Sequence, residues 1–540
     1  MRWQTKDSLK ELLVNLVEYQ SITGSEDEVA VAEYIHRNLS FLPYFKHNTD
    51  MVKLHPLTDG RSFVTALVKK PGVKRTVILL SHFDVVPVED YGPWKQLAFR
   101  ADALTAEFYK YRSRLPDDVQ RDLDEGEWLF GRGAMDMKAG AALHMSMIEK
   151  AAAGEFEGNV LMLSVPDEEV NSAGMIEAVP VLIEMAKQYG LEYAVCLNSE
   201  PMFSRYPGDH AKYVYTGSVG KLLPGFFCYG KETHVGEPFS GLNSNYMASE
   251  ISRILELNAA FCERVGDEAT PPPVNLMQKD LKEEYSVQIP HASVALFNVM
   301  NMKRSGEDIT SLLMQVARAA ARNIEDNFLR RARQFAGFQS YSPKPVKVQV
   351  FTYETLKQKA IALYGEEEIH RRQNYLIANR HDAGDRDFTT ILVHDLAALC
   401  NKEAPMIILF YSPPFYPAVS SADNPWIMDT VNDLIAYSKK TYNVDFKHQY
   451  YFAGLSDLSF VQLKETEEGL SPLTENMPLF QNGYNLPIEA LKALNVPVLN
   501  LGPLGRDAHQ WTERLELSFS FGTLHELLSR TVGRLLENTP

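Results

Sequence analysis

VILLSHFD, residues 77–84, is the stretch of sequence that decides the expected fold. Four apolar residues typical of a buried strand lead to Ser81, and His82 and Asp84 then stand two positions apart. In an extended backbone, residues i and i+2 project from the same face, so the strand presents an imidazole beside a carboxylate. Open α/β sheets keep their ligand sites at the carboxyl ends of their strands. A carboxylate beside a histidine is typical of metal sites, although a single H-x-D also occurs by chance.

Strands and helices are expected to alternate on either side of this stretch. Further strands are expected at residues 63–68, 159–165 and 193–197. Strong helix formers over 139–152 indicate a helix, and Ser25 and Glu28 have the spacing of a capping box for a helix over 29–39. The polar stretch 94–127 is expected to be a surface loop or a short helix. The alternation favours a mainly parallel α/β sheet.

From about Val214 the pattern changes to a β-α-β-α-β block, which we expect to be a smaller inserted domain. Within it, Ser305 and Asp308 can cap a long amphipathic helix that ends near Phe335. The α/β pattern resumes near Asp423. The expected domains are therefore one α/β domain in two parts, residues 1–213 and 416–540, and an insertion at residues 214–415.

The composition is that of an ordinary globular protein, with 45% hydrophobic and 23% charged residues over 540 positions, a length that favours two domains. The formal charge of −16 argues against nucleic acid as a partner, because surfaces that bind nucleic acid are basic. The four cysteines are scattered, the N-terminal residues do not resemble a signal peptide, and no apolar run reaches 18 residues. We therefore expect a cytoplasmic protein with reduced thiols and no membrane partner.

Potential metal ligands follow the strands of the first domain. They are His82, Asp136, Glu168, Glu169 and Glu200, with His509 in a Gly-rich loop near the C-terminus. Imidazole and carboxylate ligands without cysteine fit Zn²⁺, Mn²⁺ or Co²⁺. Two imidazoles and three carboxylates would leave two divalent ions with a residual positive charge, which would acidify a water molecule between them. One of the two adjacent glutamates can then bind metal while the other faces that water as a general base.

At this point the motifs resemble a known family. SHFDVV, GRGAMDMKAG, PDEE, NSEP and GPLGRDAH are similar, in this order, to motifs of the dizinc metallopeptidase family of aminoacylases, glutamate carboxypeptidases, acetylornithine deacetylase and succinyl-diaminopimelate desuccinylase. The resemblance covers most of the chain, and this longer form looks most like the arginine-utilisation branch of the family in bacilli. It implies an α/β fold with a zinc-exopeptidase-like three-layer catalytic domain, residues 1–213 and 416–540, and an inserted α+β lid domain.

The resemblance also implies a role for each candidate residue. It implies five ligands of two divalent ions, most simply zinc, in two sets that share Asp136: His82 with Glu200, and Glu169 with His509. Asp84 would orient His82. Glu168 would be the general base that takes a proton from the water and passes it to the leaving amine. The peptide bond between Asp136 and Met137 is expected to be cis, as it is in the family.

A second group of implied residues lies in the insertion. KETHVGEPFSGLN resembles the lid loop of the family, in which His234 would stabilise the tetrahedral oxyanion. In dimeric relatives that histidine reaches the active site of the partner, so a homodimer through the lid domain is expected. The arginine that often binds a substrate carboxylate has no clear counterpart in NVMNMKRSG, where Lys303 and Arg304 are the candidates.

The expected function is metal-dependent hydrolysis of an amide bond in a small molecule. The favoured substrate is an N-acyl amino acid, with a compound of arginine or ornithine catabolism suggested by the branch resemblance alone. Two alternatives remain open. The same site would serve a dipeptidase or carboxypeptidase acting on a short peptide, and a non-catalytic binding or regulatory protein could retain the fold. Asp457, in a turn that resembles one near the family's cleft, is expected to brace its loop rather than to bind metal.

Overall fold

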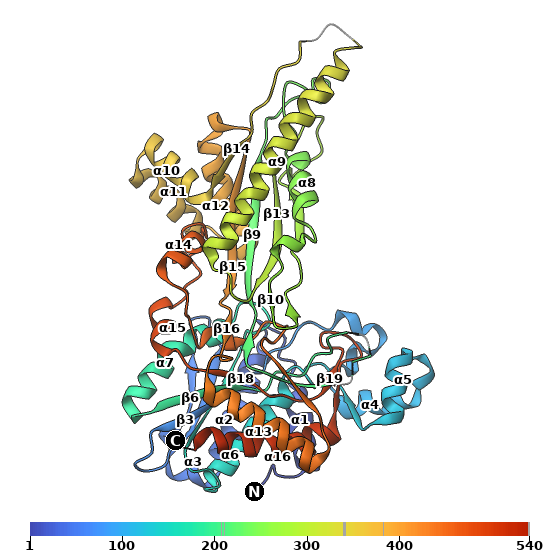
Figure 1. The fold of residues 1–540 in the computed structure, drawn as a ribbon, viewed down its shortest axis with the longest axis vertical. Coiled ribbons are helices and arrows are strands. Elements are labelled where there is room, and N and C mark those ends of the chain that lie inside the picture. The colour runs from blue at the N-terminus through green and yellow to red at the C-terminus, as the bar shows by residue number, and fades with distance from the viewer. Residues whose placement is uncertain (207, 210, 339–341, 382, 538–540) are drawn as a thin grey trace. The chain divides into compact units, whose positions relative to one another are not determined.

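The chain forms two compact units in the computed structural model, which describes residues 1–206, 208–209, 211–338, 342–381 and 383–537 (Figure 1). Unit 1 comprises Met1–Val219, Pro417–Lys464 and Pro487–Pro540. Unit 2 comprises Gly220–Tyr416 and Glu465–Leu486. Each unit has its own sheet and its own apolar core.

Unit 1 is built on an eight-stranded sheet in the order β1-β2-β5-β3-β6-β18-β7-β17. The strands are β1 (Val52–Pro56), β2 (Ser62–Val68), β3 (Arg75–His82), β5 (Asn159–Val165), β6 (Glu192–Asn198), β7 (Lys212–Tyr215), β17 (Phe446–Gln449) and β18 (Val498–Asn500). The central strand β3 runs parallel to β5 on one side and to β6 on the other, and β18 runs parallel to β6. The carboxyl ends of these four strands therefore meet at one edge. Because the chain passes from β5 to β6 across β3, this edge is a topological switch point.

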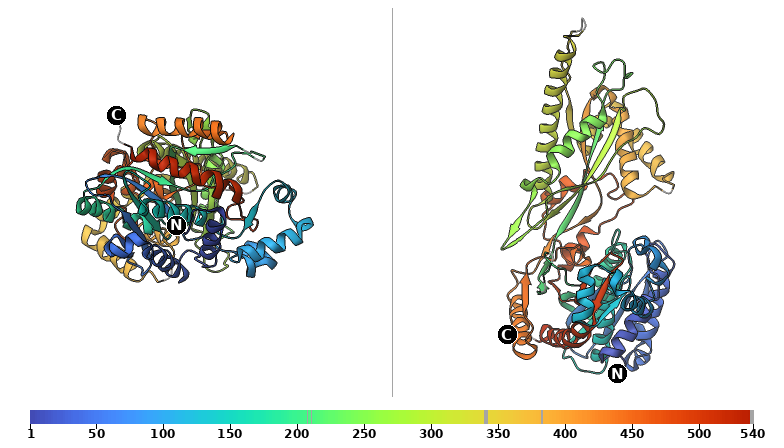
Figure 2. Two further views of the ribbon diagram at one scale, coloured as in Figure 1. Left: turned by 90° about the horizontal axis from the view of Figure 1, so that it is seen from below. Right: turned by 90° about the vertical axis from the view of Figure 1, so that its right-hand side faces the viewer.

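Helices lie on both faces of this sheet (Figure 2). The main ones are α1 (Lys6–Val17), α2 (Asp27–Ser40), α6 (Lys138–Ala152), α7 (Ala173–Tyr189), α13 (Pro425–Tyr442) and α16 (Leu524–Leu536). On β3, Val77 and Leu79 pack into one core cluster with apolar residues of α1, α6 and α16, while Ile78 and Leu80 of the opposite face are equally buried. The three-layer α/β class expected from the sequence is confirmed.

The expected capping box at the start of α2 is wrong. The helix begins at Asp27, and its N-cap residue makes no side-chain cap. The carboxylate of Glu28 is instead buried, where it accepts a hydrogen bond from the backbone N–H of Gly24 and pairs with Arg61 at 3.0 Å. The partly buried guanidinium of Arg61 attracts this carboxylate more strongly than the exposed end of a helix does.

Of the two alternatives expected for the polar stretch 94–127, a surface loop or a short helix, the structure shows helices. They are α4 (Ala101–Lys110) and α5 (Asp117–Glu125). Their apolar faces are buried in a separate cluster that includes Leu104, Phe108 and Leu123 and packs against Trp128. The hydrophobic residues of this cluster are spaced at helical intervals between charged residues. The composition of the segment is therefore polar, although one face of each helix is buried.

Unit 2 is built on a five-stranded sheet in the order β12-β13-β9-β15-β14. The strands are β9 (Gly220–Tyr229), β12 (Val274–Asp280), β13 (Ala292–Asn301), β14 (Gln349–Thr352) and β15 (Met406–Tyr416). The helices α8 (Ser244–Leu255) and α9 (Gly306–Phe335) pack against this sheet, and the predicted capping box of Ser305 and Asp308 is confirmed at the start of α9. This is the inserted α+β domain that the fold class includes.

Two further segments belong to unit 2. The helices α10 (Tyr353–Tyr364), α11 (Glu366–Ala378) and α12 (Asp385–Leu399) form an apolar cluster with Phe227 and Ile408 of the sheet. Residues Glu465–Leu486, which were expected in the α/β domain, also group with unit 2. The reason is that α14 (Glu467–Thr474) packs on α9, where the carboxylate of Glu465 accepts the backbone N–H of Gly306 at 2.6 Å. Among the described residues, no helix has the length and apolar character of a membrane-spanning segment.

We predict that protonation of His144 destabilises unit 1 in acid. In the buried helix α6, Nε2 of His144 donates to Ser199 Oγ at 2.9 Å, because that hydroxyl donates to the Leu501 carbonyl. Burial lowers the pKa of His144 to about 3. An unfolded imidazole titrates near 6.5, so the unfolded chain binds more protons between these values, and stability falls as pH drops from about 6.5 towards 3.

The measurement is denaturant unfolding at pH 7 and pH 5 in a chelating buffer. The wild type is expected to lose more stability between the two pH values than His144→Gln, which cannot gain this proton. An equal loss in the two proteins would show that His144 does not contribute to the acid sensitivity.

Candidate metal centre

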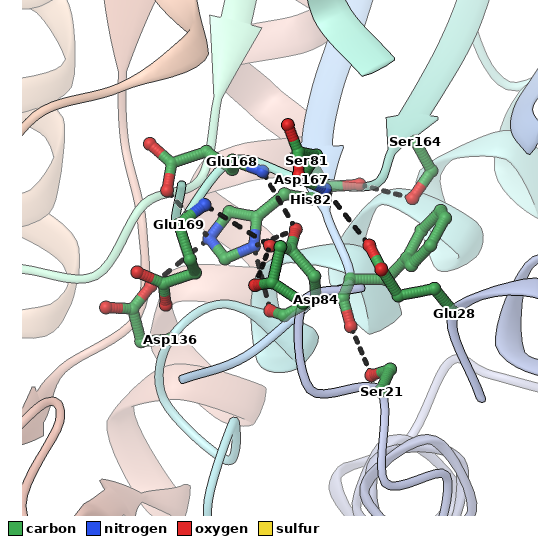
Figure 3. A network of polar contacts seen from close by, with 12 residues as sticks. Ser21, Glu28, Ser81, His82, Asp84, Asp136, Ser164, Asp167, Glu168 and Glu169 are labelled. Atoms are coloured by element: carbon green, nitrogen blue, oxygen red, sulfur yellow. Dashed lines mark hydrogen bonds and ion pairs between the residues drawn. The ribbon is translucent and has the colours of Figure 1, made fainter. Parts of the chain in front are cut away.

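His82 stands at the carboxyl end of β3, buried among the carboxylates predicted to lie near it (Figure 3). Its Nδ1 lies 3.1 Å from the main-chain oxygen of Asp84 and 3.4 Å from a carboxylate oxygen of the same residue. When the ring is neutral, Nδ1 is therefore the donor, and Nε2 keeps a lone pair that can bind a metal ion. That nitrogen faces Asp136 at 3.4 Å and Glu200 at 3.7 Å. A buried nitrogen acceptor that faces carboxylates has the arrangement of a metal ligand.

Asp136 lies between the two predicted histidine ligands. One carboxylate oxygen is 3.4 Å from Nε2 of His82, and the other is 3.3 Å from Nε2 of His509. The residue follows β4 (Trp128–Phe130) and precedes α6, and the expected cis peptide bond to Met137 is present. The buried carboxylate of Glu513 accepts the backbone N–H of Asp136 at 3.4 Å. With one oxygen towards each imidazole, Asp136 has the orientation that a bridging ligand needs.

The loop after β5 brings Glu168 and Glu169 to the same place through Asp84. The Asp84 carboxylate accepts the backbone N–H of Glu168 at 3.0 Å and that of Glu169 at 3.2 Å, and it also accepts the hydroxyl of Thr23 at 2.8 Å. Figure 3 shows the contacts of the Asp84 carboxylate with the backbone of Glu168 and Glu169, next to the ring of His82. One carboxylate thus holds the end of β3 and the loop after β5 together. Asp84 positions two further candidate residues besides His82.

Behind this loop lies a buried ion network. Arg61 contacts Glu28 at 3.0 Å and Asp167 at 2.9 Å, and the carboxylate of Glu28 accepts the backbone N–H of Asp167 at 3.2 Å. Asp167 has a positive φ of 72° and its carboxylate accepts the backbone N–H of Ala173 at the start of α7. The tight turn that carries the two glutamates is therefore fixed on both sides.

Glu200 follows β6, where two glycines allow the backbone to pack closely. A Cβ atom on Gly140 would lie 2.5 Å from the carbonyl oxygen of Ser199, and one on Gly502 would lie 1.9 Å from that of Glu200. Only glycine permits these approaches of α6 and of the loop after β18. They keep Glu200 3.7 Å from Nε2 of His82.

His509 reaches the site from the loop after β18. Its Nε2 lies 3.1 Å from Glu169 and 3.3 Å from Asp136, and its side chain is half exposed. Asp507 and His509 both have positive φ, 58° and 64°, so this loop needs support. The fully buried guanidinium of Arg514 supplies it by contacting the carboxylates of Asp507 and, at 2.6 Å, of Asp122 on α5.

The residues present fit two cations. Ligand atoms within 4.8 Å of one another form two groups that share Asp136: His82, Asp136 and Glu200, and Asp136, Glu169 and His509. A third such group is His82, Glu168 and Glu169. Within the described part of the chain, Nε2 of His82 and one oxygen of Glu200 are buried without a hydrogen-bond partner. A divalent ion would satisfy both atoms, since imidazole nitrogen and carboxylate oxygen are ligands of zinc and similar ions.

The site holds more negative charge from buried carboxylates than its two imidazoles can neutralise, and this raises the pKa of several carboxyl groups. Burial, together with the charges of Glu200 and Asp457, raises the pKa of Glu168 well above its ordinary value, although His82 opposes this. Burial likewise raises the pKa of Glu200 well above its ordinary value. Burial also raises the pKa of Asp457 to about 7. Bound protons would be released on metal binding, as is usual for sites of this kind.

The same excess of carboxylates raises the pKa values of the two imidazoles. Hydrogen bonds to Asp136 and Glu169 raise the pKa of His509 to about 10. Burial lowers the pKa of His82, but the charge of Glu200 and contacts with Asp136 outweigh it, so that the pKa lies well above the ordinary value. Positive charge is favoured at both ligand positions, which is the electrostatic condition for a cation.

Three other predicted residues are not members of these ligand groups. His234 lies on an exposed loop of unit 2, where Nδ1 accepts the backbone N–H of Gly236 at 3.1 Å. Arg304, a candidate for carboxylate recognition, donates to the main-chain oxygens of Ala260 and Phe261 at 3.1 and 3.0 Å and so braces unit 2. Asp457 is buried, and its charge acts on Glu168 without joining the ligand groups found among the described residues.

Sequence reasoning missed the residues that support the ligands. They are Glu28, Arg61, Arg132, Glu513 and Arg514. Arg132 and Arg514 lie inside or next to quoted motifs, but no spacing signalled that they would be buried. Arg132 contacts Glu513 at 2.8 Å with both side chains almost fully buried.

The chain is similar to known proteins in sequence and in fold. The family model of peptidase family M20/M25/M40 matches residues 78–519. The chain is 54% identical to the uncharacterized protein YqjN of Bacillus subtilis, over 100% of this chain and 98% of that protein. It is 31% identical to the protein RocB of the same organism, over 98% of this chain and 95% of RocB. The crystal structure of an M20 family metallo-carboxypeptidase from Sulfolobus solfataricus shares the fold, with a TM-score of 0.54 at 14% identity over 98% of both chains.

We predict that Asp84→Asn weakens metal binding. The amide keeps the shape of the side chain, but it cannot accept both backbone N–H groups and also favour the tautomer of His82. Loss of such a supporting carboxylate typically costs about 10- to 100-fold in metal affinity. Zinc affinity is measured by competition with a chromophoric chelator, and Asp50→Asn, at an exposed position, is the control. Equal zinc affinity in both variants would contradict the role of Asp84.

Proposed function

Because the chain belongs to peptidase family M20/M25/M40, and so to the metal-dependent hydrolases of C–N bonds, we propose that it removes the acyl group from an N-acyl amino acid. The observation that carries this proposal is Asp136, whose two carboxylate oxygens each face one imidazole, with Glu168 beside them. This arrangement suits two cations and a base acting on one water molecule. An arginine- or ornithine-derived substrate is the first to test, because the sequence resembles the arginine-utilisation branch.

The proposed metal ligands fall into two sets. His82 and Glu200 would hold one divalent ion, Glu169 and His509 the other, and Asp136 would bridge them. Zinc is the first candidate, with manganese and cobalt as alternatives. When bound, such ions polarise the substrate carbonyl and lower the pKa of water. The chain itself supplies a rigid edge of sheet, with each ligand at the end of a different strand or loop.

Glu168 is the proposed general base. Its carboxylate lies 4.0 Å from Nε2 of His82 and is almost fully buried, while its backbone is held by Asp84. Burial and the neighbouring carboxylates raise the pKa of Glu168, so that its carboxylate readily holds a proton. Glu168 would accept a proton from the attacking water and donate it to the nitrogen of the leaving amine.

His234 is the proposed donor to the oxyanion of the tetrahedral intermediate. Because Nδ1 accepts the Gly236 N–H, the proton of the neutral ring lies on Nε2. That N–H group is the kind of donor that stabilises an oxyanion.

We predict that Glu168→Gln removes activity and retains metal. Loss of a general base costs about 10²- to 10⁴-fold in kcat, while none of the five proposed ligands changes. The assay measures free amine released from a panel of N-acyl amino acids and dipeptides, with two metal ions per chain expected by elemental analysis. Preference for dipeptides in this panel would favour the peptidase alternative over the deacylase.

The matched control is Glu184→Gln, an exposed glutamate on α7 that is expected to behave as wild type. Wild-type protein that binds fewer than two ions, or that cleaves nothing in the panel after addition of zinc, manganese or cobalt, would overturn the proposal and favour the non-catalytic alternative.

We further propose that the protein forms a homodimer through unit 2. The strand β12 is an edge of the five-stranded sheet, and it exposes Val274 and Leu276 by 38% and 57%. An exposed apolar edge strand is a site for pairing with another chain. A second copy of this edge would cover both side chains.

The expected solution mass is that of two chains, and Leu276→Glu is expected to reduce it to one chain, because a buried charge opposes the contact. Leu363→Glu, at an exposed leucine of α10, should leave the dimer intact. Light scattering after size-exclusion chromatography measures both variants. A wild-type monomer, or a dimer in Leu276→Glu, would refute this interface.

A further inference from the structure

A cavity of about 710 Å³ lies in unit 1 next to the loops that carry the proposed ligands. Three residues that line it, Met135, Met202 and Ala508, are one or two positions from Asp136, Glu200 and His509 respectively. The cavity therefore adjoins the metal centre along three of its loops. Its volume suits an extended polar side chain and its end group.

The helix α5 forms another wall of this cavity. The residues of α5 that line it are Asp118, Arg121, Asp122 and Glu125, which recur at helical spacing and so share one face. This helix lies in the polar stretch 94–127, and it is held in place by ion pairs. One carboxylate oxygen of Asp122 contacts the buried guanidinium of Arg514 at 2.6 Å and Nε of Arg506 at 3.2 Å. The wall is therefore tied to the loop that carries His509.

Two charges on this wall are not used in the anchoring. Within the described residues, no hydrogen bond or ion pair is found for the side chain of Arg121 or of Glu125. The two residues are four positions apart on α5, so their side chains are neighbours on one helical face. A guanidinium and a carboxylate thus stand side by side, both lining the cavity.

We propose that this cavity binds the charged end of the substrate, an amino-acid group that carries both a carboxylate and an ammonium. Arg121 would bind the carboxylate through two parallel hydrogen bonds, and Glu125 would accept hydrogen bonds from the ammonium. The inference rests on the proposed function, since the amide bond is cleaved at the adjoining metal centre. It narrows the substrate to a diamino acid acylated on its side-chain nitrogen, with its α-amino and α-carboxyl groups free.

The test measures binding rather than turnover. The protein is the full chain with Glu168→Gln, loaded with zinc, and the measurement is titration calorimetry. Three probes share one acetamide and one carbon chain: Nε-acetyl-L-lysine carries both charges, 6-acetamidohexanoate only the carboxylate, and N-acetylcadaverine only the ammonium. Nε-acetyl-L-lysine is expected to bind about tenfold more tightly than either singly charged probe, as a charge-assisted hydrogen bond permits.

Two variants then separate the two charges. Arg121→Gln is expected to weaken binding of the two probes with a carboxylate about tenfold and to leave N-acetylcadaverine unchanged, and Glu125→Gln is expected to do the reverse. Arg114→Gln changes an exposed arginine of the same polar stretch that does not line the cavity, and is expected to have no effect. Because both tested residues are on the exposed side of α5, neither substitution should affect folding.

Equal affinity for the three probes would overturn the inference, as would an Arg121→Gln variant that binds all three as before. The outcomes also distinguish a failure of this cavity assignment from a failure of the proposed hydrolase function. If the wild type cleaves no N-acyl compound but the probes follow the expected pattern, the hydrolase proposal fails and the cavity assignment stands. If the wild type cleaves N-acyl compounds but the probes do not follow the expected pattern, the hydrolase proposal stands and the cavity assignment fails.

Discussion

The carboxylate of Asp84 is the constraint on which the candidate metal centre depends. It lies just after the end of β3 and accepts the backbone N–H groups of Glu168 and Glu169. It also lies beside the ring of His82, whose Nδ1 contacts the main-chain oxygen of Asp84. The two glutamates are adjacent in sequence, and their shared acceptor fixes the peptide units that carry them. The proposed base Glu168 and the proposed ligand Glu169 can therefore lie on different sides of one site, although they are adjacent in the chain, because their backbone is held in place.

Burying several carboxylates at one edge of a sheet is unfavourable unless positive charge lies close to them. Three arginines supply it, each behind a different loop. Arg61 lies behind the loop of Glu168 and Glu169, Arg132 contacts the carboxylate that holds Asp136, and Arg514 supports the loop of His509. Their planar guanidinium groups each serve two or more carboxylates, which lysine could not do in the same geometry. Because these arginines contact the supporting carboxylates, the side chains of the proposed ligands remain free to face one another and a cation.

Two helical segments pack through apolar clusters: the stretch 94–127 has a separate cluster, and α10–α12 share one with the sheet of unit 2. They differ in what they contribute. The helices α10–α12 pack against the sheet of unit 2. The helix α5 sends Asp122 to Arg514 and Arg506 and so becomes part of the support of His509. A helix that supports a ligand loop can also shape the cavity beside the metal centre, and residues of α5 line that cavity.

The sequence by itself determined the features that depend on neighbours in the chain. The strand at 77–82, the position of His82 at its end, the α/β alternation and the capping box of α9 all follow from local spacing. Only the tertiary structure decided which side chains support the site, because those pairs are far apart in sequence: Arg132 and Glu513 by 381 positions, Arg514 and Asp122 by 392. Glu28 shows the limit most clearly. Its spacing from Ser25 predicted a helix cap, but burial beside Arg61 gave its carboxylate a stronger partner. Local spacing contains no information about which distant cation will lie next to this carboxylate.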